Sequence, residues 1–281
     1  MAIMRISSFT LLVAWSTLLN LKIYFRFLEI FMLTRLFFLV NTATDIMNPV
    51  KRLDPLWKIL FLSSIFYCSI LCSSGYAQNK LPDGFIRLSE IIPDVHVDLR
   101  YYSKDNFLGR PVEGYLSPVC ILSLQAAKAL SKVQLDLKKE GLKLKIFDAY
   151  RPQRAVDDFV QWAKSLNDTT MKKTYYPKVS KALLFEQGYI ASRSGHTRGS
   201  TVDLTLIDST GKNLDMGTPW DFFSPKSWPS SQAVPEQAQR NRAFLRQVMQ
   251  RHGFIPYEAE WWHFTLEYEP FPNPYFDFPI Q

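Results

Sequence analysis

Apolar residues recur with two different periods along the chain, and these periods predict its helices and strands. Two segments have the spacing of three to four residues that one buried helical face requires. The first runs from Ser123, which can cap a helix, to about Glu140, and the second runs from Pro235 to Gly253. Another helix is expected directly after Pro152, because proline is favoured in the first turn of a helix.

Strands are predicted where apolar and polar residues alternate. The alternating segments are residues 95–101, residues 142–146, the segment that begins at Val202, and residues 260–266. In the third of these, Asp203 and Thr205 are expected on the face opposite the core, where they would form the floor of a cleft. The pattern predicts an α+β fold: a single domain with a small antiparallel sheet flanked by helices.

Other segments lack a regular period and are expected to form connections. Residues 106–118 contain several glycines and prolines and predict an irregular excursion, whereas residues 164–193 predict a connection with some helix. Residues 209–212 can turn a hairpin, and residues 219–235 are rich in aromatic residues and proline, as expected of a loop folded over another part of the molecule. The tail after Tyr268, rich in proline and phenylalanine, is expected to wrap the surface.

The first 77 residues do not have the pattern of a folded domain. Lys58 precedes an apolar run over residues 59–71, and small residues stand three and one positions before Gln78. This order predicts a secretory signal peptide over residues 47–77 that is cleaved before Gln78. The remaining residues, 78–281, are enough for one domain, and we expect this domain to be exported to the periplasm or the extracellular space.

Residues 1–46 admit two interpretations. Residues 9–40 are apolar but contain four charged residues, so no charge-free run reaches the length of a membrane span. Because Met47 can begin a conventional signal peptide, the favoured interpretation is an over-extended translation start. The alternative is an additional segment that anchors the protein to the membrane. Cys72 follows bulky residues, which argues against lipid modification there.

Cysteine content and charge restrict the remaining possibilities. Cys68 and Cys72 fall within the predicted signal peptide, so Cys120 is alone in residues 78–281 and no intrachain disulfide is expected there. Removing the seven basic and three acidic residues of 1–77 from the 33 and 26 of the whole chain leaves a net charge of +3 rather than +7. Nucleic acid is therefore not an expected partner, and no stable membrane contact is expected once the signal is removed.

Two short segments contain residues suited to a hydrolytic metal centre, one around His196 and Asp203 and the other around Glu260 and His263. Neutral imidazole and carboxylate are good zinc ligands, and three protein ligands leave a position for water. One carboxylate then remains to act as a base. Arg151, at the junction between a predicted strand and a predicted helix, is available to stabilise an oxyanion.

Each of these pairs is weak evidence by itself. Glu260 and His263 are three residues apart and would point to opposite faces of a regular strand. They can reach one metal only if Glu260 lies on the turn before the strand or if a bulge intervenes. The other histidines have simpler explanations. His96 is expected at a surface or hydrogen-bonded position. His252 stands beside the C-terminus of the last predicted helix, where the helix dipole favours a histidine.

Taken together, the segments resemble the D-alanyl-D-alanine dipeptidase family of the VanX type. The resemblance extends over nearly all of residues 78–281, and its joint pattern is specific. It is carried by Ser194-x-His196-x-x-Gly199-x-x-x-Asp203 with Leu-Thr-Leu after it, Met216-Gly217-Thr218 with Asp221, Glu260-x-Trp262-His263, Asp98-Leu99-Arg100-Tyr101, Asp105-Asn106-Phe107 and Tyr150-Arg151-Pro152-Gln153.

The resemblance implies a set of roles for these residues. It implies one Zn²⁺ per chain, bound in a cleft on the sheet by His196, Asp203 and His263. It also implies that Glu260 is the general base and that Arg151 stabilises the tetrahedral intermediate.

The resemblance further implies a small D,D-dipeptide as the substrate. The candidate substrate-binding residues are Ser194, Asp221, Tyr101 and Tyr115, the first three of which fall near groups that hold the free amine of the dipeptide in the family.

Three functions are compatible with this sequence. The leading one is zinc-dependent hydrolysis of D-Ala-D-Ala type dipeptides. The second is a D,D- or L,D-carboxypeptidase or endopeptidase that acts on longer peptidoglycan stem peptides with the same metal centre. The third is a non-catalytic peptide-binding module that retains zinc, but a binder needs neither the base Glu260 nor the oxyanion partner Arg151. Whether residues 106–118 and 217–235 close the cleft decides between the first two.

Overall fold

The computed structural model describes residues 80–281. The predicted signal peptide, its cleavage position, the upstream apolar stretch and the first two cysteines lie outside the described residues. Within residues 80–281 the elements are β1 (Phe85–Arg87), β2 (His96–Val97), β3 (Ile121–Ser123), α3 (Leu124–Lys139), β4 (Lys143–Asp148), α4 (Gln153–Lys164), α5 (Lys172–Tyr175), β5 (Thr201–Ile207), α6 (Glu236–Arg251), β6 (Phe254–Tyr257) and β7 (Glu260–Leu266), together with short 3-10 helices.

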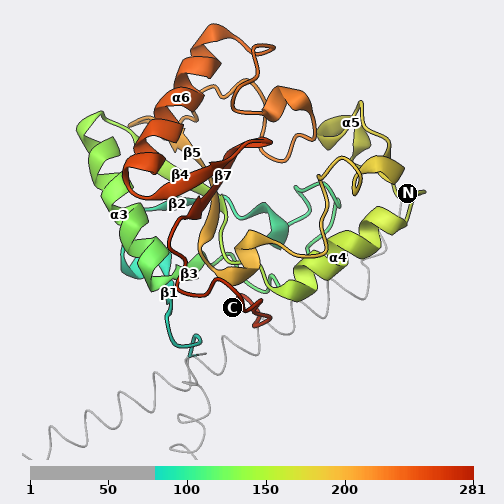
Figure 1. The fold of residues 1–281 in the computed structure, drawn as a ribbon, viewed down its shortest axis with the longest axis horizontal. Helices are drawn as coiled ribbons and strands as arrows, with labels where there is room; N and C mark the ends of the chain where they lie inside the picture. The colour runs from blue at the N-terminus through green and yellow to red at the C-terminus, as the bar shows by residue number, and fades with distance from the viewer. Residues whose placement is uncertain (1–79) are drawn as a thin grey trace, which may run out of the picture. The chain divides into compact units, whose positions relative to one another are not determined.

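The main sheet has the strand order β2-β4-β5-β7-β6, and β1 and β3 form a separate antiparallel pair. All neighbours in the main sheet are antiparallel except β2 and β4, which run parallel. The predicted α+β class with a small sheet flanked by helices is therefore confirmed, although one pair departs from the expected antiparallel arrangement. Figure 1 shows α3 and α6 beside one another on one side of the sheet and α4 and α5 on the other.

Local sequence accounts for the helices. The Ser123 hydroxyl accepts a hydrogen bond from the Ala126 amide at the start of α3, which satisfies one of the free N–H groups of the first turn. Leu130, Val133 and Leu137 on the inner face have no solvent exposure. The predicted helices after Pro152 and Pro235 are likewise confirmed as α4 and α6.

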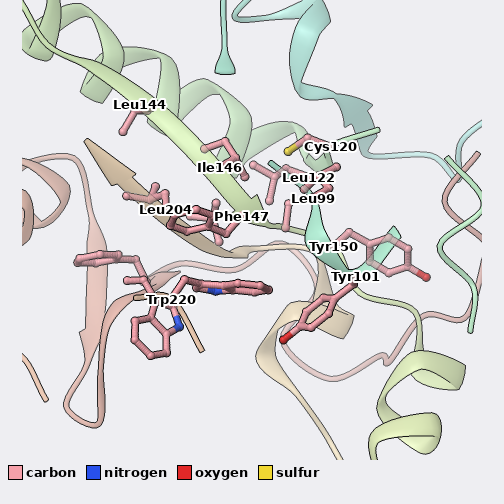
Figure 2. Close-up of a cluster of buried hydrophobic side chains, with 14 of the residues drawn as sticks. Leu99, Tyr101, Cys120, Leu122, Leu144, Ile146, Phe147, Tyr150, Leu204 and Trp220 are labelled. Carbon is pink, nitrogen blue, oxygen red and sulfur yellow. The ribbon is translucent and has the colours of Figure 1, made fainter. Parts of the chain in front are cut away.

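The core lies between the sheet and the elements that cover it. Figure 2 shows Leu144 and Ile146 of β4 near Leu204 of β5, all three without solvent exposure. Phe147 stacks on Trp220, with ring centroids 5.4 Å apart and ring planes 20° apart. Trp220 comes from the aromatic loop 219–235, so this loop packs against the sheet, as its composition predicted.

This packing also determines the environment of β5. Asp203 and Thr205 were expected on the face opposite the core, as the floor of a cleft, and all seven residues of β5 are buried. The strand lies in the middle of the sheet, and the loop that carries Trp220 covers the face opposite α3 and α6. Asp203 is only 1% exposed but lines a cavity, as expected, whereas Thr205 does not line the same cavity.

Three other segments differ from the sequence-based expectation. Residues 95–101 form only the two-residue β2 followed by a 3-10 helix. The turn at residues 209–212 forms, but only a single bridge between Ile207 and Asn213 follows it. Strand β6 was not predicted, because four residues that include Pro256 do not show a clear alternation.

The C-terminal tail does more than wrap the surface. The rings of Phe271, Phe276 and Phe278 surround Phe85 at centroid distances of 5.4, 4.8 and 5.0 Å. Ile280 is buried and bridges to Tyr115. The tail therefore closes part of the core that β1 and β3 leave open.

No helix within residues 80–281 is both long enough and apolar enough to cross a bilayer.

Gly199 provides a test of how tightly this part of the core is packed. Its φ is +79°, and a Cβ atom there would come within 2.7 Å of Phe85 Cζ. Gly141 has a φ of +71° with no atom within 4 Å of the same position. We expect Gly141→Ala to lower the free energy of unfolding by about 1–2 kcal/mol, the cost of a left-handed residue. Gly199→Ala should cost about 1–3 kcal/mol more, because Phe85 must move.

Urea denaturation of both variants in the presence of a chelator measures the difference without a contribution from metal binding. Equal destabilisation of the two variants would contradict the close contact with Phe85.

Candidate functional site

The register of the sheet brings the candidate metal ligands together. Asp203 on β5 is the direct cross-strand partner of His263 on β7, and Asp148 on β4 is the partner of Asp203 on its other side. His196 comes from a 3-10 helix, Gly195–Arg198, which leads into β5. The Ser194 hydroxyl caps this short helix by accepting a hydrogen bond from the His196 amide.

Three donor atoms converge at this point of the sheet. His196 Nε2 lies 3.2 Å from Asp203 Oδ1 and 3.3 Å from His263 Nδ1, and His263 Nδ1 lies 3.1 Å from Asp203 Oδ1. Two ligands bound tetrahedrally to zinc at about 2.0–2.1 Å lie roughly 3.3 Å apart. The three separations therefore match the spacing of a tetrahedral zinc site, and these residues are the one such group of potential ligands among residues 80–281.

The protonation of these groups also suits a metal. His196 Nδ1 lies 2.7 Å from the Ala149 carbonyl oxygen, which can only accept, so the proton is on Nδ1 and the lone pair of Nε2 faces the other two donors. Burial lowers the pKa of His196, which favours its neutral form. Although burial opposes ionisation of Asp203, the two neighbouring histidines, His196 and His263, together hold the pKa of this carboxyl below its usual range.

One atom of this group is left without a partner. Asp203 Oδ1 is buried and accepts no hydrogen bond from any residue between 80 and 281, whereas Asp203 Oδ2 is 3.3 Å from the donor Trp220 Nε1. A buried carboxylate oxygen without a partner is costly. A cation bound between Asp203 and the two histidines removes that cost, so the donor set fits a divalent metal.

Glu260 lies beside the three donors. It is the first residue of β7, directly after a two-residue turn, and the pairing of β6 with β7 is irregular at Tyr257, its partner. The sequence required a turn or a bulge here, and the structure has both. Glu260 Oε2 consequently reaches 3.6 Å from His263 Nδ1. Burial raises the pKa of Glu260 to about 7, which suits a group that exchanges protons near neutral pH.

Arg151 is held in place by a buried carboxylate. Its Nε and Nη2 atoms donate to Asp148 Oδ2 at 2.9 and 2.8 Å, and Nη2 is 3.8 Å from Asp203 Oδ2. Tyr115 donates its hydroxyl to Asp148 Oδ1 at 2.7 Å. Tyr115, expected to bind substrate, therefore does not line the cavity but lies behind Arg151, where it fixes Asp148.

Asp221 forms a second acidic position in the site. Its Oδ2 accepts a hydrogen bond of 2.7 Å from the Tyr101 hydroxyl. Its φ of 59° is in the left-handed region, which non-glycine residues seldom occupy and which is often found at functional positions. Burial, together with the negative charge of Asp203, raises the pKa of Asp221 well above its usual range.

These groups line one cavity of about 250 Å³. Of the candidate residues, all except Tyr115 are among its walls, together with Phe107, Phe223, Tyr189, Tyr257 and Arg193. The two loops predicted to roof the cleft contribute Phe107 and Phe223. Residues 188–191 and Arg193, next to the predicted Ser194, form a further wall that sequence reasoning did not assign. The volume is below the usual 300–1,000 Å³ of sites for drug-sized ligands, so the cavity suits a small one.

The other two histidines lie outside the donor group, in positions consistent with the simpler explanations. His96 is exposed on β2. His252 follows α6 and its Nε2 atom is 2.8 Å from Asp136 Oδ2. Trp261 and Trp262 are both buried.

Comparison with known proteins agrees with this geometry. The model of the peptidase M15 family, described as D-Ala-D-Ala dipeptidase, matches residues 82–281. The chain belongs to this family. It is therefore a metallopeptidase.

Several relatives named D-alanyl-D-alanine dipeptidase are similar over most of their length. The protein from Streptomyces coelicolor is 42% identical over 197 residues, which cover 70% of this chain and 98% of the relative. The protein from Enterococcus faecium is 39% identical over 199 residues, with 70% and 98% covered. The protein from Escherichia coli is 35% identical over 181 residues, with 64% and 83% covered.

Sequence reasoning did not assign a role to several residues of this M15 peptidase site. Asp148 and Trp220 contact Arg151 and Asp203 directly, and both lie next to segments that carry the family resemblance. Asp148 stands three residues before Arg151, and Trp220 stands directly before Asp221, so their positions in the sequence could have indicated a role in the site. Tyr189 and Tyr257 gave no comparable signal, because a tyrosine in a loop or at the end of a strand has many possible roles.

Proposed function

We propose that the protein is a zinc-dependent D,D-dipeptidase that hydrolyses D-Ala-D-Ala type dipeptides with one Zn²⁺ per chain. The observation that carries this proposal is the set of three donor atoms at tetrahedral separations beside the Glu260 carboxylate. His196, Asp203 and His263 are the proposed ligands. The bound ion would lower the pKa of a water molecule and polarise the peptide carbonyl.

Glu260 is the proposed general base. A carboxyl group with a pKa near neutrality can accept a proton and then return it to the leaving amine. Its position 3.6 Å from the proposed ligand His263 supports this role, since three protein ligands and one water already complete a catalytic zinc site.

Arg151 is proposed to stabilise the negative charge that develops on the carbonyl oxygen. Its guanidinium group is close to Asp203, and its side chain is only 11% exposed. The fixed salt bridge with Asp148 keeps the cation oriented before the reaction, so little reorganisation is needed in the transition state. Tyr115 would act on the reaction through Asp148, which holds Arg151 and also lies 3.6 Å from His196 Nδ1.

Asp221, Tyr101 and Ser194 are the proposed contacts of the substrate amine. Asp221 is buried and unpaired with any cation in residues 80–281, apart from the distant influence of Arg151. An ammonium group would give it the missing partner and restore its ionised form. A closed acidic position of this kind favours a free amine next to the scissile bond, as in a dipeptide.

The experiment that tests this proposal compares two substrates. Purified protein with one equivalent of Zn²⁺ is incubated with D-Ala-D-Ala and with a stem pentapeptide that ends in D-Ala-D-Ala. We expect the dipeptide to be cleaved with the higher kcat/KM, and a chelator to abolish cleavage. Preference for the pentapeptide would favour the alternative function, a carboxypeptidase or endopeptidase on peptidoglycan stem peptides.

Export is proposed on the basis of the sequence. Residues 47–77 have the order of a signal peptide, and residues 78–281 would be the mature enzyme in the periplasm or outside the cell. In this interpretation residues 1–46 are an over-extended start; if they are genuine, the protein is anchored to the membrane. N-terminal sequencing of the exported protein is expected to begin at Gln78, and an N-terminus at Met1 or Met47 would contradict the proposal.

A further inference from the structure

The positive charges around the cavity are not equivalent. Arg151 and Arg193 are the two arginines that line the cavity, and Arg198 lies nearby in the adjoining 3-10 helix. Arg151 is paired with Asp148, and Arg198 is paired with Glu269 through contacts of 2.6 and 2.9 Å.

Arg193 has no acidic partner within residues 80–281, although its side chain is exposed. Its guanidinium carbon instead lies 4.8 Å from the centre of the Tyr275 ring. Arg198 is 5.8 Å from the same ring and already neutralised by Glu269. Among residues 80–281, Arg193 is therefore the one arginine lining the cavity that is not paired with a carboxylate.

Contact with an aromatic ring restrains the guanidinium group but leaves its N–H groups available. The face of the ring has no strong acceptor for these donors, which remain free to form the paired hydrogen bonds that a carboxylate accepts. A carboxylate is also the ligand that gains most from such a fork, because two parallel charge-assisted bonds form at once.

The remaining charges of the cavity make this position distinctive. The carboxylates of the walls, Asp203, Asp221 and Glu260, are already assigned to the metal, the amine and the base. A peptide that enters the cavity carries a carboxylate at its own C-terminus, and this carboxylate needs a cation as its partner. Arg151 cannot serve it without giving up either Asp148 or the oxyanion. Arg193 is therefore the group that can attract this end of the peptide.

We propose that Arg193 binds the C-terminal carboxylate of the peptide substrate and that Tyr275 holds its guanidinium group at the cavity wall. The inference rests on the proposed peptidase function and extends it, because it makes a free C-terminus a requirement for efficient cleavage. With Asp221 at the amine, the site would then recognise both charged ends of a zwitterionic dipeptide.

The test uses substrates that differ only in the C-terminal charge. Wild type and Arg193→Gln are assayed with D-Ala-D-Ala and with its C-terminal amide in the presence of Zn²⁺. Lys178→Gln is the matched control, since Lys178 is exposed, lies outside the cavity and changes the net charge by the same amount. Arg193→Lys keeps the charge but removes the fork.

We expect Arg193→Gln to lower kcat/KM for the free dipeptide by about 10-fold or more, mainly through KM. Its effect on the amide should be less than about 3-fold, so the preference of wild type for the free acid is lost. Arg193→Lys should recover part of the loss, and Lys178→Gln should behave as wild type. An equal loss on both substrates, or no loss on the dipeptide, would overturn the assignment of Arg193.

Failure of the proposed function is visible separately. If wild type cleaves only the stem pentapeptide, the dipeptidase proposal is overturned, and the same comparison of acid with amide is made on the pentapeptide to decide the role of Arg193. If wild type cleaves neither substrate, both proposals are overturned.

Discussion

His263→Ala is expected to lose stoichiometric zinc and, with it, the hydrolysis of D-Ala-D-Ala. The substitution removes one of three donor atoms that lie 3.1–3.3 Å from one another. Loss of a residue that only forms a hydrogen bond to a metal ligand typically lowers metal affinity by roughly 10- to 100-fold, so loss of a ligand itself should lower the affinity further. Two remaining ligands are too few for a stable catalytic zinc site.

His96→Ala is the matched control for this prediction. His96 is an exposed histidine on the edge strand β2, outside the donor group. Both variants are dialysed against zinc-free buffer and their metal content is determined per mole of protein, with circular dichroism as the check of folding. Full occupancy in His263→Ala would show that the ligand assignment is wrong. Loss of zinc from the control as well would point to a site elsewhere.

The helices of this fold could be predicted because their signals are local. Ser123 caps α3, prolines precede α4 and α6, and the buried positions repeat with the helical period. Strand β7 was predicted with the same bounds for a similar reason. Strand β6 was missed because its four residues contain a proline and expose two of their apolar side chains, Ile255 and Tyr257.

The environment of the site depended on contacts that the sequence does not display. Asp203 was expected on the face opposite the core, but nothing in the sequence showed that Trp220, from a separate loop, contacts it there. The pairing of Asp203 with His263 depends on the register of the two strands. A sequence specifies this register only through the pattern of all buried residues along both strands. The neighbours Asp148 and Tyr115 of Arg151 likewise come together only in the folded chain.

The chemical types of the site residues, in contrast, were readable in advance. Two histidines and two carboxylates in two short segments already indicated a hydrolytic metal centre, and all four prove to be neighbours in space. What the sequence could not separate was contact with substrate from support of another residue. Tyr115 illustrates this, because a hydroxyl that binds Asp148 and one that binds a peptide require the same residue type.

Glu260→Gln is expected to retain zinc but turn over D-Ala-D-Ala very slowly. Glutamine keeps the shape of the side chain and removes its ability to accept a proton. Loss of a general base typically lowers the rate by about 100- to 10,000-fold. Zinc content should stay close to one equivalent, because the three proposed ligands are unchanged and Glu260 lies beside them rather than among them.

The pH dependence of wild type gives this prediction a second readout. Glu260 must be ionised to act as a base, and without a metal its pKa is raised by burial to about 7. A cation bound beside it favours the ionised form and lowers this pKa. We therefore expect kcat/KM to rise with pH through an apparent pKa no higher than about 7, and activity to be lost as the pH falls below it. In Glu260→Gln this acidic limb should be absent from the residual activity.

Glu258→Gln separates this role from a general effect of charge. Glu258 is exposed two residues earlier and, in the part of the chain that the structure describes, pairs only with Arg246 at the surface, so its replacement should leave turnover, zinc content and the acidic limb unchanged. Near-normal turnover in Glu260→Gln would remove Glu260 from the mechanism. Loss of zinc from Glu260→Gln would instead show that Glu260 is a ligand. The general base would then have to be another group that lines the cavity, and Asp221 is the remaining carboxylate there that is not a proposed ligand.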